Sequence, residues 1–185
     1  MGHANFGESE SNHIAIMNML PNRSDTDETT WNEFLTSTQE ILDEHSDIPI
    51  FHWHHYERSK IDVYVQRYGD PNGVAARIRK NLIDLHELVK NHFALPVYSY
   101  SLKEVEKHIG FQRSLPNKDG GWAIAQILQA KQSNNEEELQ SQLDELAVYN
   151  KEDILATNKV LQWLLNTPVP SGSSKKKNER LYSPD

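Results

Sequence analysis

The stretch Asp47-Ile48-Pro49-Ile50-Phe51-His52-Trp53-His54-His55-Tyr56-Glu57 decides the fold of this 185-residue chain. Its first seven residues are rich in β-branched and aromatic side chains, and its proline lies where the first positions of a strand tolerate one, so they predict a strand. A helix is predicted from near Tyr56 to just before Gly69. A strand that leads directly into a helix is typical of α/β proteins, in which ligands bind beyond the carboxyl ends of the strands.

The rest of the chain repeats this alternation of short strands and helices. His13–Leu20 predicts a strand, and the apolar run Leu82–Leu85 leads toward a further helix or turn. Thr30 and Glu33 have the spacing of a capping box, which predicts that a helix begins there. The expected helices pass through Leu35 and Leu42, through Leu88 and Val89, from Ser101 to Gly110, from Trp122 to Leu128, and from about Glu136 to Leu165.

These elements predict an α/β fold in which helices flank a sheet. We expect a flexible N-terminus over residues 1–12, one folded domain over residues 13–166, and a disordered tail over residues 167–185. The tail is rich in Ser, Gly, Pro and Lys, which is the composition of a segment that cannot build a packed core.

Charge and composition narrow the classes of function. A net charge of -8 argues against binding nucleic acid through bulk basic charge, but not against an enzyme that approaches phosphates through metal ions held by acids. No apolar run approaches the ~18 residues of a membrane span, and the first residues do not have the pattern of a secretory signal. The absence of cysteine excludes disulfides and thiolate metal sites, and fits a cytoplasmic location.

The long C-terminal helix carries Tyr149-Asn150-Lys151-Glu152-Asp153. Tyr149 and Asp153 are four residues apart, so they lie on one face of the helix, with Glu152 beside them. A carboxylate can hold a hard divalent metal ion and a nearby tyrosine can position a water molecule, a pairing that suits metal-dependent hydrolysis of phosphodiesters. The alternative is a solvated acid and a half-buried tyrosine on an ordinary amphipathic helix, where such pairs are common.

Two other acids lie where ligands of a metal ion are expected. Glu57 follows the strand that ends near Trp53, at the edge of the sheet where α/β proteins bind ligands, although it could instead complement the helix dipole. Asp84 interrupts the apolar run Leu82–Leu85, so it must be paired, bound to metal, or used to cap the helix that follows.

Three histidines are clustered at the end of the same strand. His52 and His54 share one face of the strand, and His55 adds a third imidazole. A zinc site needs three or four tetrahedral ligands, and the sequence shows no second cluster to complete one. We therefore expect His52, His54 and His55 to line a polar cleft or to contact a phosphate of nucleic acid. Motifs for nucleotide phosphates and for serine hydrolases are absent from the sequence.

The order of these motifs resembles a known family. A strand of aromatic residues and histidine runs into Tyr56-Glu57, followed by Ile83-Asp84-Leu85, by Ser99–Lys103 with Gly110-Phe111, and by Tyr149–Asp153. This order resembles the ribonuclease H-like domain of the YprB and predicted RecB-type nuclease families, which belong to the DEDD group of 3′-to-5′ exonucleases. The resemblance covers residues from about Trp31 to Leu165.

The resemblance implies a fold, an activity and a set of roles. It implies a ribonuclease H-like sheet and hydrolysis of DNA or RNA with Mg²⁺ or Mn²⁺. Glu57 corresponds to the acid of the second motif, with glutamate in place of the usual aspartate, and Asp153 to the last metal ligand. Tyr149 corresponds to the tyrosine that positions the attacking water, and Asp84 to a recurrent acid that could be a further ligand. In related proteins a helicase or a second nuclease domain accompanies this one.

The first motif of the family, Asp-x-Glu on the opening strand, has no counterpart on an apolar strand before Trp31. Glu8-Ser9-Glu10 has the right spacing, but its surroundings are too polar for a central strand. We therefore expect an N-terminally truncated or degenerate copy of the family domain. The alternative function is a catalytically inactive module that binds nucleic acid or a partner protein.

Overall fold

The computed structural model describes residues 3–5, 15–17, 27–46, 48–115, 118–132 and 135–168. Helices dominate this part of the chain, and short strands alternate with them. The elements are β1 (His3–Asn5), β2 (Ala15–Met17), α1 (Asp27–His45), β3 (Ile50–His52), α2 (Tyr56–Tyr68), α3 (Val74–Asn81), β4 (Leu82–Asp84), α4 (Leu85–His92), α5 (Leu102–His108), α6 (Gly120–Gln132) and α7 (Glu136–Asn166). β1 pairs with β2 in antiparallel fashion, and β3 pairs with β4 in parallel. The chain therefore has the mixed α/β architecture that the sequence predicts.

Several predicted boundaries are confirmed. α2 ends at Tyr68, where Gly69 takes a left-handed φ of 82° and donates its N–H to the Val65 carbonyl at 2.9 Å. Ser101 caps α5 by accepting the N–H of Glu104. The long helix predicted from about Glu136 to Leu165 is α7, which ends one residue later.

In the first half of the chain, one expectation requires correction and one helix was not predicted. α1 begins at Asp27, so Thr30 lies inside the helix and does not cap it. α3 was not predicted, because its eight residues include four that are charged or strongly polar and its apolar face is short. The side chain of Asp70 begins this helix, since its two oxygens accept the N–H groups of Ala75 and Ala76, each at 3.0 Å.

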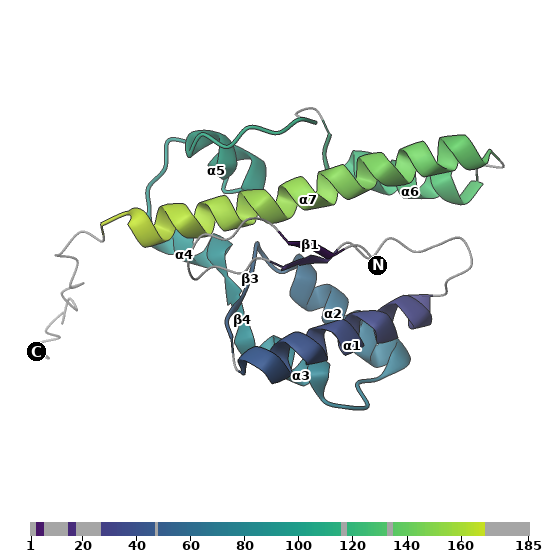
Figure 1. Ribbon diagram of the computed structural model, residues 1–185. Helices are drawn as coiled ribbons and strands as arrows, with labels where there is room; N and C mark the ends of the chain where they lie inside the picture. The colour runs from purple at the N-terminus through teal and green to yellow at the C-terminus, as the bar shows by residue number, and fades with distance from the viewer. Residues whose placement is uncertain are drawn as a thin grey trace, which may run out of the picture.

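The apolar side chains form two clusters. The N-terminal cluster joins α1, α2 and α3 and consists of Trp31, Leu35, Leu42, Ile61, Val74, Ala75 and Ile78. The C-terminal cluster joins α4, α5 and α7 and consists of Val89, Val105 and Val160, with Trp53 and Trp163 packed against it. In Figure 1, α1–α3 form the lower half and α4–α7 the upper half, while β3 and β4 run between them. The ends of these strands therefore lie where the halves meet.

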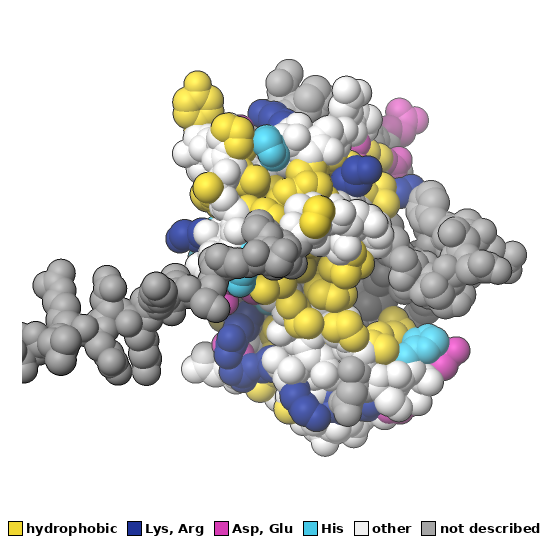
Figure 2. Space-filling view, turned by 90° about the vertical axis from the view of Figure 1, so that its left-hand side faces the viewer, with side chains coloured by type: hydrophobic (Ala, Val, Ile, Leu, Met, Phe, Trp, Pro, Cys, Tyr) yellow, Lys and Arg dark blue, Asp and Glu magenta, His cyan; other side chains and the backbone are white. Residues whose placement is uncertain are grey.

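One face of the molecule combines apolar and basic side chains. Figure 2 shows hydrophobic side chains gathered across its middle, with Lys and Arg side chains above and below them. Among the described residues, no helix is long and apolar enough to cross a membrane. The segment Glu8-Ser9-Glu10 and most of the predicted tail lie outside the described residues, so the predicted domain boundaries stay predictions.

Candidate functional site

The site is built at the carboxyl ends of β3 and β4. The two parallel strands are in register, so that His52 at the end of β3 lies opposite Asp84 at the end of β4. α2 begins four residues after β3 and carries Glu57 in its first turn, whereas α4 begins directly after Asp84. The parallel pairing thus brings Glu57 and Asp84 to one edge of the sheet.

Asp84 is held in place by two backbone groups. Its Oδ1 accepts the N–H of His86 at 2.9 Å, which caps α4, and the N–H of His54 at 2.8 Å, which ties the turn after β3 to the end of β4. Asp84 therefore caps α4, which is one of the roles that the sequence predicts for it. It also fixes the backbone around the strand ends.

Glu57 lies beside the buried imidazole of His52. The His52 side chain is 7% exposed; its Nδ1 donates to the His54 carbonyl at 2.6 Å and lies 3.7 Å from Glu57 Oε2. The Glu57 side chain is 49% exposed, and its partial desolvation raises the pKa of the carboxyl against the lowering effect of its own backbone N–H and of His52. The negative charges of Asp84 and Asp153 raise this pKa further. Acids from α2, β4 and α7 are therefore within electrostatic reach of one another.

Tyr149 and Asp153 lie one turn apart on α7. The Tyr149 side chain is 8% exposed and packs 5.7 Å from the ring of Trp122, measured between ring centroids. Burial raises the pKa of Tyr149 to about 12, and the negative charge of Asp153 contributes in the same direction. The phenol is consequently neutral near pH 7 and retains a proton that it can donate in a hydrogen bond.

Arg113 connects Asp153 to a buried acid that the sequence did not single out. The guanidinium and the Glu106 carboxylate are each 3% exposed and form two hydrogen bonds of 2.6 Å, from Nε and Nη2. The remaining nitrogen, Nη1, lies 2.7 Å from Asp153 Oδ1. Because Glu106 fixes the guanidinium, Arg113 presents a positive charge to Asp153 from a constrained position. Glu106 and Arg113 lie seven residues apart, in a helix and a loop, so no local pattern links them.

The neighbouring acid, Glu152, has a structural role. Its Oε1 accepts the backbone N–H of Ser114 at 2.6 Å and the Ser114 hydroxyl at 2.7 Å. Burial acts to raise the pKa of this carboxyl, but the hydrogen bonds from Ser114 and the charge of Arg113 lower it below its usual value. Consecutive residues of α7 therefore hold consecutive residues of the loop before α6.

The histidines differ in their surroundings. His52 is buried, whereas His54 and His55 are exposed and lie with their ring centroids 4.1 Å apart. His86 was not part of the predicted site, and its ring centroid lies 4.6 Å from that of His54. Burial lowers the pKa of His86, and His54 lowers it further. His54 also takes a left-handed φ of 66°, a conformation that non-glycine residues seldom adopt.

The acids fit a hard divalent cation in chemistry but not in arrangement. Carboxylate oxygens are among the ligands that Mg²⁺ and Mn²⁺ prefer. Within the described ranges, however, no three His, Asp or Glu side chains gather closely enough to hold an ion. Asp84 accepts backbone N–H groups, Asp153 faces Arg113, and Glu57 lies beside His52.

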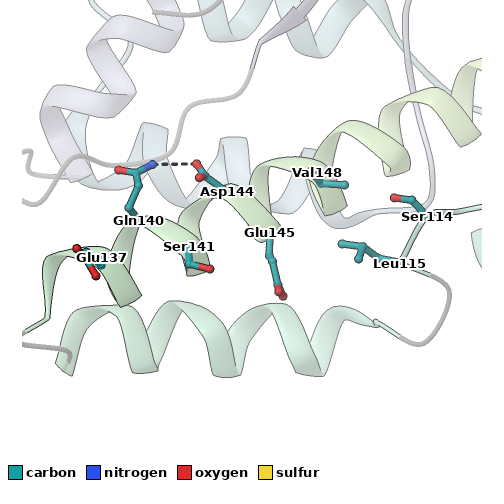
Figure 3. Close-up of a pocket in the computed structure, with 8 residues that line it drawn as sticks. All are labelled: Ser114, Leu115, Glu137, Gln140, Ser141, Asp144, Glu145 and Val148. Atoms are coloured by element: carbon teal, nitrogen blue, oxygen red, sulfur yellow. Dashed lines mark hydrogen bonds between the residues drawn. The ribbon is translucent and has the colours of Figure 1, made fainter.

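An open pocket lies next to this region without including the acids that the sequence predicted. Figure 3 shows that its lining comes from the N-terminal half of α7 and from the loop before α6, with Gln140 hydrogen-bonded to Asp144 at 2.8 Å. Its residues are Ser114, Leu115, Glu137, Gln140, Ser141, Asp144, Glu145 and Val148. Three carboxylates in this lining make it a poor place for a phosphate.

Comparison with known proteins identifies the family of this chain. Residues 2–165 match the model of the family RNase_H_2, described as RNase_H superfamily. This chain belongs to the RNase H superfamily. The match covers most of the chain and supports the ribonuclease H-like fold that the order of motifs implies. Domains of the RNase H superfamily act on nucleic acids. No curated protein and no solved structure matches the chain.

Proposed function

We propose that this chain is a nuclease domain of the 3′-to-5′ exonuclease kind, which hydrolyses phosphodiester bonds of DNA or RNA with Mg²⁺ or Mn²⁺. Within the RNase H superfamily we place it with the YprB and RecB-type nucleases of the DEDD group. One observation carries the proposal: the parallel pairing of β3 with β4 brings Glu57 and Asp84 to one edge of the sheet, where the negative charges of Asp84 and Asp153 help to raise the pKa of Glu57. An acid whose pKa is raised by its surroundings at the end of a strand is a candidate for function.

The residues of the chain have distinct roles in this proposal. Tyr149 remains protonated near pH 7, so its hydroxyl can donate a hydrogen bond to a water molecule or a phosphate oxygen. Arg113, anchored by Glu106, limits the movement of Asp153. Glu57, Asp153 and Asp84 are the residues that would have to move together to hold a Mg²⁺ or Mn²⁺ ion. The ion would supply the charge that activates water and stabilises the leaving oxygen.

The direct test is degradation of 5′-labelled single-stranded DNA and RNA with Mn²⁺, with Mg²⁺ and with EDTA. We expect products that shorten from the 3′ end in the presence of either metal, and no products in EDTA. Asp153→Asn should abolish cleavage. Asp43→Asn is a matched control, because Asp43 also pairs with an arginine, Arg77, at 2.6 Å but belongs to α1. Unchanged cleavage by Asp153→Asn contradicts the proposal.

A second candidate function is a catalytically inactive module that binds nucleic acid. The observation in its favour is that Asp153 faces a buried cation, Arg113, while no three metal-ligand side chains gather in the described residues. Titration with Mn²⁺ distinguishes the two functions. Nucleic-acid binding without Mn²⁺ binding and without cleavage would favour the inactive module.

A further inference from the structure

Lys103 lies beside the candidate site with its charge unmatched by a carboxylate. Its Nζ lies 5.6 Å from the centroid of the Tyr149 ring, and Tyr149 is one helical turn from Asp153. Among the described residues, Lys103 forms no ion pair. The side chain is half-buried, so its stem packs while its ammonium group can reach solvent.

The other two cations in this region are already paired. Arg113 also lies near the Tyr149 ring, 5.7 Å from its centroid, but its nitrogens face Glu106 and Asp153. Lys118 lies 4.2 Å from the centroid of Trp122 and 3.4 Å from Glu145. In this part of the structure, Lys103 is thus the cation beside Tyr149 that remains available to an anion.

The position of Lys103 does not serve the stability of its helix. It is the second residue of α5, after the cap at Ser101, and the N-terminal end of a helix favours negative rather than positive side chains. Lys107, near the end of the same helix, is placed as the dipole prefers and pairs with Glu104 at 3.4 Å. The helix dipole therefore does not account for a cation at this position.

We infer that Lys103 binds a backbone phosphate of a single nucleic-acid strand and holds that strand next to Tyr149 and Asp153. The ligand class is a phosphodiester, and the contact is independent of base sequence. In a protein with a net charge of -8, such a contact must come from a local cation rather than from the overall field. The inference rests on the nucleic-acid binding part of the proposed function and requires neither a metal ion nor cleavage.

The test measures binding of fluorescently labelled single-stranded DNA and RNA, each of two unrelated sequences, by anisotropy in EDTA over a range of salt concentrations. Each phosphate contact to a single strand contributes about 0.7 to the slope of log K against log salt concentration. We expect Lys103→Gln to lower the magnitude of that slope by about this amount and to weaken binding of both sequences about equally.

Lys107→Gln is the matched control, because it removes the same charge from the same helix where the lysine is 68% exposed and paired. It should leave the slope unchanged, and Lys103→Arg should retain most of the affinity. The inference is overturned if Lys103→Gln binds as the wild type does, or if Lys107→Gln loses as much slope as Lys103→Gln. If the wild type binds neither DNA nor RNA, the proposed function fails together with the inference. If the wild type binds and Lys103→Gln binds equally well, only the inference about Lys103 fails.

Discussion

At the scale of single residues, the candidate site depends on contacts that join α7 to the loop before α6. Arg113 and Ser114 of the loop meet Asp153 and Glu152 of the helix. The buried pair between Arg113 and Glu106 anchors this arrangement from the side of α5. Sequence could not indicate it, since an isolated arginine in a loop gains a partner only once α5 and α7 have packed.

Replacing Arg113 by methionine should destabilise the fold by about 3–5 kcal/mol, because Glu106 would keep a buried charge without its partner. Chemical denaturation followed by circular dichroism measures the free energy of unfolding. The double variant Arg113→Met, Glu106→Leu should recover most of the loss. Arg79→Met, which breaks an exposed pair with Asp62, should cost under about 1 kcal/mol. Equal losses in the two single variants would refute the prediction.

Glu57 and Glu152 should give stability opposite dependences on pH. The folded state raises the pKa of Glu57, so the stability that this residue contributes is present in acid and is lost as the pH rises through the raised pKa. The folded state lowers the pKa of Glu152, so its contribution is present near neutral pH and is lost as the pH falls through the lowered pKa.

Relative to wild type, Glu57→Gln should therefore become more stable as the pH rises from acid to neutral, and Glu152→Gln less stable. Denaturation curves at a series of pH values test both variants. A stabilising change at Glu57 would also support a functional role, because an acid that costs stability is kept for some other reason. Parallel pH profiles for the two variants would be inconsistent with the described contacts.

At the scale of elements, residues close to the helix ends predicted several helix boundaries correctly. Gly69 ends α2 and Ser101 begins α5 because a left-handed glycine and a capping serine act within a few residues. α7 was predictable over its length from its periodic apolar residues. α3 was not, since the Asp70 side chain that begins it acts from four residues before Val74. The family resemblance implied that Glu57, Asp84 and Asp153 share one site. Pairing of β3 with β4 brings Glu57 and Asp84 to one edge of the sheet, but within the described residues no three such side chains gather closely.

Asp84 is a candidate metal ligand that also caps α4, and substitutions at this residue measure how much the cap contributes to stability. Asp84→Ala should cost about 0.5–2 kcal/mol of stability, because α4 loses its cap. The turn after β3 also loses its hydrogen bond from His54. Asp84→Asn should retain nearly all of the stability, since asparagine caps helices about as well. The measurement is thermal or chemical unfolding, with Ser101→Ala as a comparison cap on α5. A loss as large in Asp84→Asn as in Asp84→Ala would mean that the charge itself is needed.

At the scale of the whole molecule, two apolar clusters meet at the strand ends that carry the candidate site. Glu57 lies in the first turn of α2, a helix of the N-terminal cluster, whereas Asp153 and Tyr149 belong to α7 of the upper half (Figure 1). The acids from the two halves therefore keep their spacing only while both halves are folded. Sequence analysis predicted one domain but could not show two clusters, because the partition depends on which helices pack together.

A cavity in either cluster should loosen its own half first. Leu42→Ala should cost about 2–5 kcal/mol, because Leu42 is 1% exposed. Hydrogen exchange followed by mass spectrometry should show faster exchange mainly in α1–α3. Val160→Ala should instead accelerate exchange mainly in α4, α5 and α7. Uniform acceleration across the chain in both variants would indicate a single cooperative unit.

The late position of Val160 has a consequence for synthesis on the ribosome. Every residue of the N-terminal cluster precedes Leu82, whereas Val89 and Val105 must wait for Val160 to emerge. At a translation rate of about 5–20 residues per second, synthesis from Val89 to Val160 takes roughly 4–14 s. During this time the nascent chain exposes apolar side chains that chaperones recognise. We therefore expect synonymous codons that slow translation between α5 and α7 to lower the soluble yield without altering the finished protein.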